Sequence, residues 1–204
     1  MAGAVEEVKP AVAQTASRNE CGRGIALTIL NPIKPGWTRM VRLNLLIGRH
    51  FPAILWGLRK LSFIHFARWC IIDRVPYNGP PQVEEDLRYD YLMFLSNYNG
   101  YWVQYVDAFS HVVPRQMDLV WGNTYGYPRG APSGPLKRVI RKVDSEYVAS
   151  HYYSAYPEAS ATMVQSALEL KRRFDEFQEA LAGLEPEAFR ASFARFVTDT
   201  QQYL

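Results

Sequence analysis

Apolar and polar residues alternate along this chain in a way that predicts strands and helices in turn. Short β-rich or alternating runs bounded by Pro, Gly and Asn indicate strands. Apolar residues spaced three and four apart indicate helices, with breaks at Pro and Gly. The predicted strands cover 25–30, 62–73, 91–97 and 146–156. The predicted helices cover 38–47, 54–61, 101–113, 158–182 and the segment after Pro186.

This order of elements predicts an α+β fold. Strands and main helices follow the order β-α-β-β-α-β, which is typical of a ferredoxin-like split βαβ antiparallel sheet with extra C-terminal helices. Both main helices would cover one face of the sheet, and the C-terminal helices, a ligand or a second subunit would cover the other. Two sheets packed face to face would form a dimeric α+β barrel. We expect a flexible arm over 1–22, the α+β domain over 23–157, and helices over 158–204 that pack on it.

The strand 62–73 is the most informative stretch. Successive side chains on a strand point to opposite faces, so His65 and Trp69 are expected on one face and Arg68 on the other. Both faces are mostly apolar, so both should be at least partly covered. A buried polar group needs a partner. We therefore expect His65 on one face and Arg68 on the other each to have a polar partner.

Composition fits a globular protein with a sizeable core. Apolar residues make up 48% of the 204 positions, and aromatic residues make up 14% with 13 tyrosines. Cys21 and Cys70 form neither a disulfide framework nor a metal motif. The acidic N-terminus lacks the basic and apolar regions of a secretory signal, and no apolar run reaches the length of a membrane span. We expect a reduced, cytoplasmic protein, with peripheral membrane association as the alternative.

The charge pattern is asymmetric although the net charge is only +3. No acidic residue occurs between Glu20 and Asp73, a span that holds eight Lys and Arg residues. Such a span favours an anionic partner, a membrane surface or the acidic part of another subunit, and the alternative is a basic surface with no partner. The amphipathic helix 38–47 within it either lies on anionic lipid or buries its apolar stripe against the sheet.

Several segments together resemble a poorly characterised bacterial family. They are Asn31-Pro-Ile-Lys-Pro-Gly36, Ile64-His-Phe-Ala-Arg-Trp69, Leu95-Ser-Asn-Tyr-Asn-Gly100, Trp121-Gly-Asn-Thr-Tyr-Gly-Tyr-Pro128 and Tyr153-Ser-Ala-Tyr-Pro157. The family carries a His-Phe-Ala-Arg strand and a Ser-Asn-(Phe/Tyr)-(Asp/Asn)-Gly turn. The resemblance covers about residues 25–180, implies the ferredoxin-like fold, and suggests haem-peroxidase and lipid-oxidising neighbours. It assigns no catalytic residue, and Asn99 stands where Asp is commoner.

The candidate site residues each have a structural alternative. His65 either ligates haem iron or acts as a base, or is a hydrogen-bonded core histidine. Arg68 holds a ligand carboxylate, or forms an internal salt bridge with Asp73 or Asp107. Asn97 belongs to a turn or points its amide into a pocket. The full candidate set is His65, Arg68, Trp69, Asn97, His151 and Tyr153.

The absent motifs narrow the function. The chain has no GxGxxG, Walker, GxSxG or HExxH motif, and no dependable metal spacing. The basic stretches lack the stacking pattern of RNA-binding sheets, so nucleic acid is not an expected partner. We therefore expect a homo-oligomer that binds a small apolar or haem-like ligand, as an accessory to oxidative metabolism or as a small oxidoreductase. The alternative is a non-enzymatic interaction protein whose basic 21–72 surface docks on an anionic protein or membrane.

Overall fold

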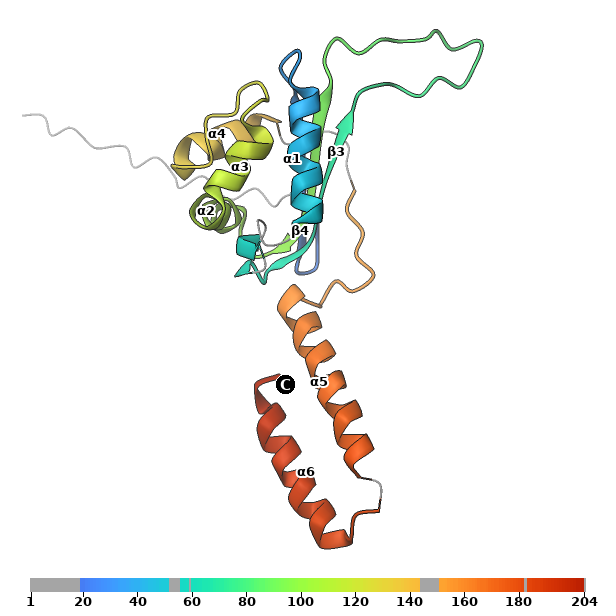
Figure 1. Cartoon of the computed structure of the whole chain (residues 1–204), viewed down its shortest axis with the longest axis vertical. Helices are drawn as coiled ribbons and strands as arrows, with labels where there is room; N and C mark the ends of the chain where they lie inside the picture. Colours follow the sequence, from blue (N-terminus) through green and yellow to red (C-terminus); the bar gives the residue numbers. More distant parts are fainter. Residues whose placement is uncertain (1–18, 52–55, 59, 144–150, 182, 204) are drawn as a thin grey trace, which may run out of the picture.

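The computed structural model of the chain describes residues 19–51, 56–58, 60–143, 151–181 and 183–203. Within these residues the protein is α+β, with one antiparallel sheet of four strands and six α-helices (Figure 1). The strands are β1 (Glu20–Cys21), β2 (Gly24–Pro32), β3 (Ile64–Ile72) and β4 (Tyr91–Asn99). The helices are α1 (Thr38–His50), α2 (Trp102–Val112), α3 (Pro114–Trp121), α4 (Ser133–Val143), α5 (Ala161–Ala180) and α6 (Pro186–Thr200), with a final 3-10 turn at Gln201–Tyr203.

The sheet has the strand order β1-β2-β4-β3. Because β4 is antiparallel to both β2 and β3, those two strands run parallel to each other with β4 between them. Helix α1 connects them, and the long loop that the sequence predicted joins β3 to β4. The prediction of an α+β chain with an antiparallel sheet is therefore confirmed.

One face of the sheet carries the core. Alternate residues of β2 and β4 point to this face, as the two-residue period requires, and α1 to α4 lie on its side of the sheet (Figure 1). The helices contribute Val41, Tyr105, Val106, Phe109, Met117, Trp121, Leu136 and Ile140. The strands contribute Leu27, Ile29, Leu92, Phe94 and Tyr98. These helices meet the sheet because each has an apolar stripe that a sheet face can bury.

The predicted strand at 146–156 differs from the structure. Residues 151–156 are not in a strand, and 146–150 lie outside the described residues. The place beside β2 is taken by β1, which falls within the stretch predicted as a flexible arm. Gly22 makes this hairpin, since its φ of +59° suits a residue without a side chain. The segment around Pro157 joins the sheet end through one hydrogen bond, in which the amide of Arg23 donates to the Pro157 carbonyl at 2.7 Å.

The second face of the sheet carries apolar side chains in the open. Phe66 is 71% exposed and Leu30 is 41% exposed. Arg68 is also exposed on this face. The expectation that both faces of strand 62–73 are covered is therefore met on the helix side only.

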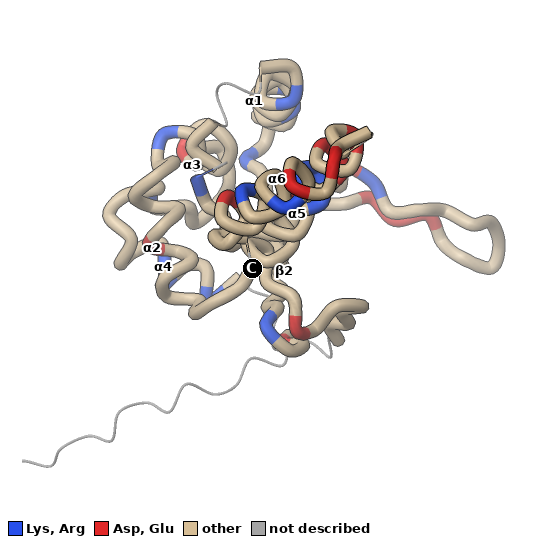
Figure 2. Tube along the Cα trace, turned by 90° about the horizontal axis from the view of Figure 1, so that it is seen from below, with Lys and Arg blue, Asp and Glu red and all other residues tan. Residues whose placement is uncertain are grey.

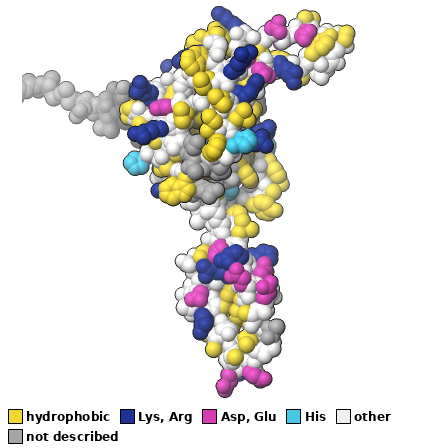
Figure 3. Space-filling view, viewed as in Figure 1, with side chains coloured by type: hydrophobic (Ala, Val, Ile, Leu, Met, Phe, Trp, Pro, Cys, Tyr) yellow, Lys and Arg dark blue, Asp and Glu magenta, His cyan; other side chains and the backbone are white. Residues whose placement is uncertain are grey.

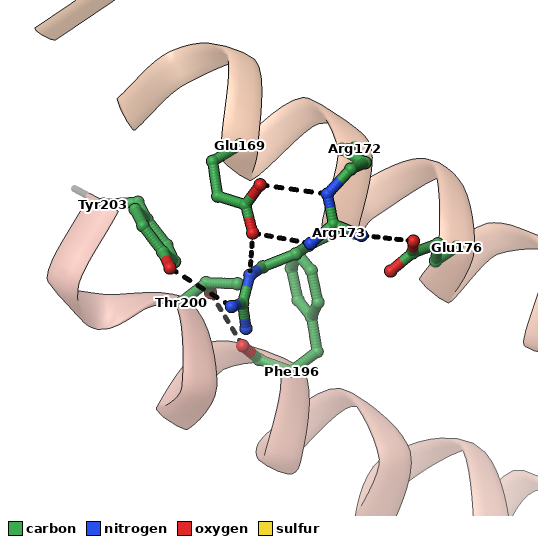
Figure 4. A network of polar contacts seen from close by, with 7 residues as sticks. All are labelled: Glu169, Arg172, Arg173, Glu176, Phe196, Thr200 and Tyr203. Carbon is green, nitrogen blue, oxygen red and sulfur yellow. Dashed lines mark hydrogen bonds and ion pairs between the residues drawn. The ribbon is translucent and has the colours of Figure 1, made fainter. Parts of the chain in front are cut away.

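Helices α5 and α6 form a hairpin that projects away from the sheet rather than lying on it (Figure 1). Phenylalanine rings fill the seam between them, with Phe177 and Phe196 stacked at 4.7 Å between centroids. Beside the seam, Glu169 accepts hydrogen bonds from Arg172 and Arg173 at 2.6 to 2.9 Å (Figure 4). The hairpin is thus held mainly by contacts within itself.

Asn99 joins this hairpin to the sheet. Its amide nitrogen donates to the carbonyl of Arg23 at 2.8 Å, and its amide oxygen accepts from the backbone N–H of Ala161 at 2.8 Å. Ala161 is the first residue of α5, where an N–H has no acceptor within the helix. One side chain at the end of β4 therefore links the β1–β2 turn to the start of α5.

Candidate functional site

A groove of about 680 Å³ lies between α1, the edge strand β3 and α3. Its volume is in the range of small-molecule sites, which are typically about 300–1,000 Å³. Helix α1 supplies Arg42, Asn44, Leu45, Leu46, Ile47, Gly48 and Arg49. Strand β3 supplies Trp69, Cys70 and Ile71, and α3 supplies Gln116, Leu119 and Val120.

The groove exists because α1 packs on the sheet at few points. The apolar residues of this helix lie on more than one side of it, among three arginines, yet Val41 is its only buried residue among those described. Leu45, which faces the sheet, is only half-buried. The C-terminal half of α1 therefore leaves apolar side chains exposed to the groove and to solvent.

An aromatic cluster lies behind the groove, and Trp69 is its member that lines the groove. The ring centroids of Trp69 and Phe94 lie 5.0 Å apart, and those of Trp69 and Trp121 lie 6.2 Å apart. Phe94 and Trp121 in turn meet edge to face at 5.2 Å. Such contacts fix the rings in place. The wall behind the groove is therefore rigid, and Trp69 links it to the core.

Two arginines and two amides are the strongly polar groups of the groove. Arg42 forms an ion pair with Asp73 at 2.9 Å. The side-chain amide of Asn44 donates to the carbonyl of Leu119 at 2.7 Å and so ties α1 to α3. Arg49 has no ion pair with any residue that the structure describes. The groove thus offers one cation that is free to bind an anion.

The candidate residues from the sequence do not gather in one place. Trp69 lines the groove. Arg68 and Asn97 lie instead on the open face of the sheet, opposite Leu95 and Phe66 respectively. Asp73 and Asp107, the expected partners of Arg68, pair with Arg42 and Lys137 instead.

His65 occupies an irregular position in β3. Ile64 pairs with Tyr98 and Phe66 pairs with Asn97, so His65 is the extra residue of a β-bulge. The bulge places Ile64 against the core, although simple alternation predicted it on the other face. Its imidazole ring stacks loosely on the ring of Phe66, at 6.4 Å between centroids. The bulge therefore separates His65 from the side of the strand where Trp69 lies.

His151 and Tyr153 lie on the segment that precedes α5. His151 is exposed and Tyr153 is 76% exposed. The residue between them does contact the sheet, because a Cβ added to Gly24 would meet the hydroxyl of Tyr152 at 2.9 Å. This segment thus contacts the sheet through Tyr152 while His151 and Tyr153 remain in solvent.

The described residues do not favour a metal or a histidine-held haem in the groove. They contain no group of three His, Cys, Asp or Glu side chains placed to hold a metal ion. No histidine is among the residues that line the groove, whereas a haem commonly takes an imidazole as its axial ligand. In the described part of the chain, none of the helices combines the length and the apolar content that a bilayer crossing requires.

A second, much smaller cavity of about 30 Å³ lies inside the core between β2, β4 and α2 to α4. Tyr105 lines it, and burial raises the pKa of this phenol well above its ordinary value. The hydroxyl therefore stays protonated at physiological pH. A space of this size holds no more than about one or two waters, so the larger groove is the candidate site.

Comparisons with family models, curated proteins and solved structures give no match for this chain. The candidate site therefore depends on its own geometry. The sequence does hold one signal for it, which is the basic amphipathic helix that begins at Thr38. Only the tertiary structure decides which strand and which second helix lie across from α1. Arg49 and Val120 could therefore not be chosen as site residues from the sequence.

Proposed function

We propose that the protein binds a small apolar molecule with an anionic end in the groove beneath α1. The observation that supports this most directly is the groove itself, about 680 Å³ with a mainly apolar lining and the free cation Arg49. Pockets for small molecules are typically apolar with a few polar groups that fix orientation. A long-chain carboxylate has the chemistry that matches such a lining.

Each part of such a ligand has a counterpart in the groove. The alkyl chain would lie along Leu45, Trp69 and Val120, and its burial contributes about 0.8 kcal/mol per CH₂. That amount corresponds to an affinity increase of about fourfold per CH₂ until the groove is filled. The carboxylate would meet Arg49, an exposed pair that is worth about 0.2–1 kcal/mol. The chain therefore supplies most of the affinity, and the arginine supplies orientation.

The expected role in oxidative metabolism remains a prediction, and the groove bears on which kind of ligand such a role would involve. A haem ligated by His65 would need the imidazole at the groove, but His65 lies at the bulge of β3 and outside the lining. An oxidisable apolar acid is a ligand class that agrees with both the groove and that role. We therefore favour a binding protein for such a molecule over a haem protein.

We also propose that the fold is a variant of the ferredoxin-like split βαβ and that a second copy covers the open sheet face. The β2-α1-β3 crossover with β4 inserted supports the first part. Exposed Leu30 and Phe66 support the second, since monomers rarely leave apolar sheet faces open to water. Two such faces packed together would form the dimeric α+β barrel expected from the sequence.

Titration calorimetry with dodecanoate tests the ligand proposal, with dodecanol as its uncharged counterpart. Saturable binding of both is expected, with an affinity that rises about fourfold per CH₂ across a series of shorter acids. Cys70 lines the groove, so bound ligand should also slow its reaction with a thiol reagent. Cys21 is outside the lining and serves as the internal control.

Two variants locate the ligand within the groove. Arg49→Gln should weaken dodecanoate about two- to fivefold and leave dodecanol unchanged, whereas Arg39→Gln, outside the lining, should change neither. Val120→Phe should fill the groove and abolish binding of both ligands, with a thermal unfolding curve as the check on folding. Binding that is undiminished in Val120→Phe, or no slowing at Cys70 in the native protein, would overturn the proposal.

A further inference from the structure

The outer side of α1 carries apolar side chains that the protein leaves in solvent. Met40, Leu43 and Ile47 follow one another at spacings of three and four, which places them on one side of the helix. They are between 37% and 49% exposed, and Leu46 beside them is 45% exposed. Figure 3 shows hydrophobic side chains gathered over α1 on the near face of the molecule.

Large aromatic residues extend this apolar row beyond both ends of the helix. Trp37 precedes α1 and is 45% exposed, and Phe51 follows it and is 61% exposed. Trp56, later in the chain, is 58% exposed, with the ammonium of Lys60 over its ring at 4.2 Å. Aromatic rings are the side chains that favour the boundary between water and lipid. A row that ends in aromatic residues therefore suits an interface better than bulk water.

Cationic side chains flank the row without any acid in the helix. Arg39, Arg42 and Arg49 lie on the flank toward β3, as successive 100° steps along α1 require, and of these Arg42 is paired with Asp73. Figure 2 shows the contrast with the β3–β4 loop and the α5–α6 hairpin, where acidic residues occur. A basic amphipathic helix with an apolar row matches an anionic, apolar surface in both charge and polarity.

We propose that the outer side of α1 docks on the surface of an anionic lipid bilayer. A second copy is a poorer occupant, because a two-fold contact through α1 would bring Arg39 and Arg42 close to their own copies. Nucleic acid would satisfy the arginines but leave the apolar row in water. The surface can be tested apart from the groove at Met40 and Leu43, because these two residues do not line the groove, whereas Leu46 and Ile47 do.

The docking surface and the groove share α1, and Leu46 and Ile47 belong to both, whereas Met40 and Leu43 belong to the docking surface alone. A molecule of the class proposed for the groove dissolves in bilayers, so a protein held at the lipid surface by α1 would meet it there. The helix would then rest with its apolar row among the acyl chains and its arginines among the headgroups.

Co-sedimentation of the full chain with vesicles tests this surface. Vesicles of phosphatidylcholine containing phosphatidylserine should bind the protein, pure phosphatidylcholine vesicles should bind it more weakly, and added salt should weaken the binding. The double variant Met40→Glu/Leu43→Glu should lower binding at least about tenfold. Arg39→Gln should lower binding to the anionic vesicles about fivefold. Leu168→Glu on α5 is the matched control and should bind as the native protein does.

Dodecanoate binding provides the folding check and separates the two proposals. The Met40→Glu/Leu43→Glu variant should keep dodecanoate binding, while Val120→Phe should keep vesicle binding. Vesicle binding that is insensitive to phosphatidylserine, or unaffected by the double variant, overturns the lipid surface. A dimer that the double variant dissociates, with no binding to vesicles, overturns it as well and assigns the face to a second copy.

Discussion

Asn99 offers the sharpest test of how the α5–α6 hairpin is joined to the sheet. Its amide makes two hydrogen bonds of 2.8 Å, one to the Arg23 carbonyl and one from the Ala161 N–H. A typical hydrogen bond contributes about 0.5–1.5 kcal/mol net. Asn99→Ala should therefore lower the free energy of unfolding by about 1–3 kcal/mol, measured by urea denaturation.

The Asp variant separates the two bonds. Asn99→Asp keeps an acceptor for the Ala161 N–H and adds a negative charge at the start of α5, which is worth about 0.3–1 kcal/mol. It loses the donor to the Arg23 carbonyl, which costs about 0.5–1.5 kcal/mol. We therefore expect a net loss of no more than about 1 kcal/mol, clearly less than in the Ala variant.

Hydrogen exchange reads the same bond directly. In Asn99→Ala the amide of Ala161 should exchange about tenfold faster or more, because its acceptor is gone. The amide of Met163 is an internal control, since its acceptor is the Ser160 side chain at 3.1 Å and is untouched. Unchanged protection at Ala161 in the Ala variant would refute the reasoning. So would an Asp variant in which Ala161 exchanges as fast as in the Ala variant.

Two further predictions concern the hairpin and the open sheet face. Hydrogen bonds from Arg172 and Arg173 lower the pKa of Glu169 from about 4.5 to about 2, so its contribution to hairpin stability is complete above about pH 4.5 and is lost as the pH falls toward 2. Glu169→Gln should abolish that loss of helicity in circular dichroism, whereas Glu179→Gln on the same helix should retain it. Native mass spectrometry should show a dimer that Phe66→Glu converts to monomer, and a native protein that is already monomeric contradicts the proposed pairing of sheets.

The hydrophobic pattern of the sequence determined the elements. The strands at β2, β3 and β4 and the helices α1, α2, α5 and α6 follow from local periodicity and from breaks at Pro and Gly. The pattern is sufficient for this because it records which residues share a face of one element. The sequence also showed the acid-free span around α1, because the positions of Asp and Glu can be read from it without any fold.

What lies across from each face was decided by the tertiary structure. The bulge at His65 reversed the expected side of Ile64, and β1 took the place of the strand predicted at 146–156. Asn99, predicted as part of a turn, bonds to residues 76 and 62 positions away. Pairing register and helix packing depend on contacts between distant segments, and local periodicity does not encode them. For the same reason, the sequence showed that α1 is amphipathic and basic, but only the fold showed which of its apolar residues line a groove and which are left in solvent.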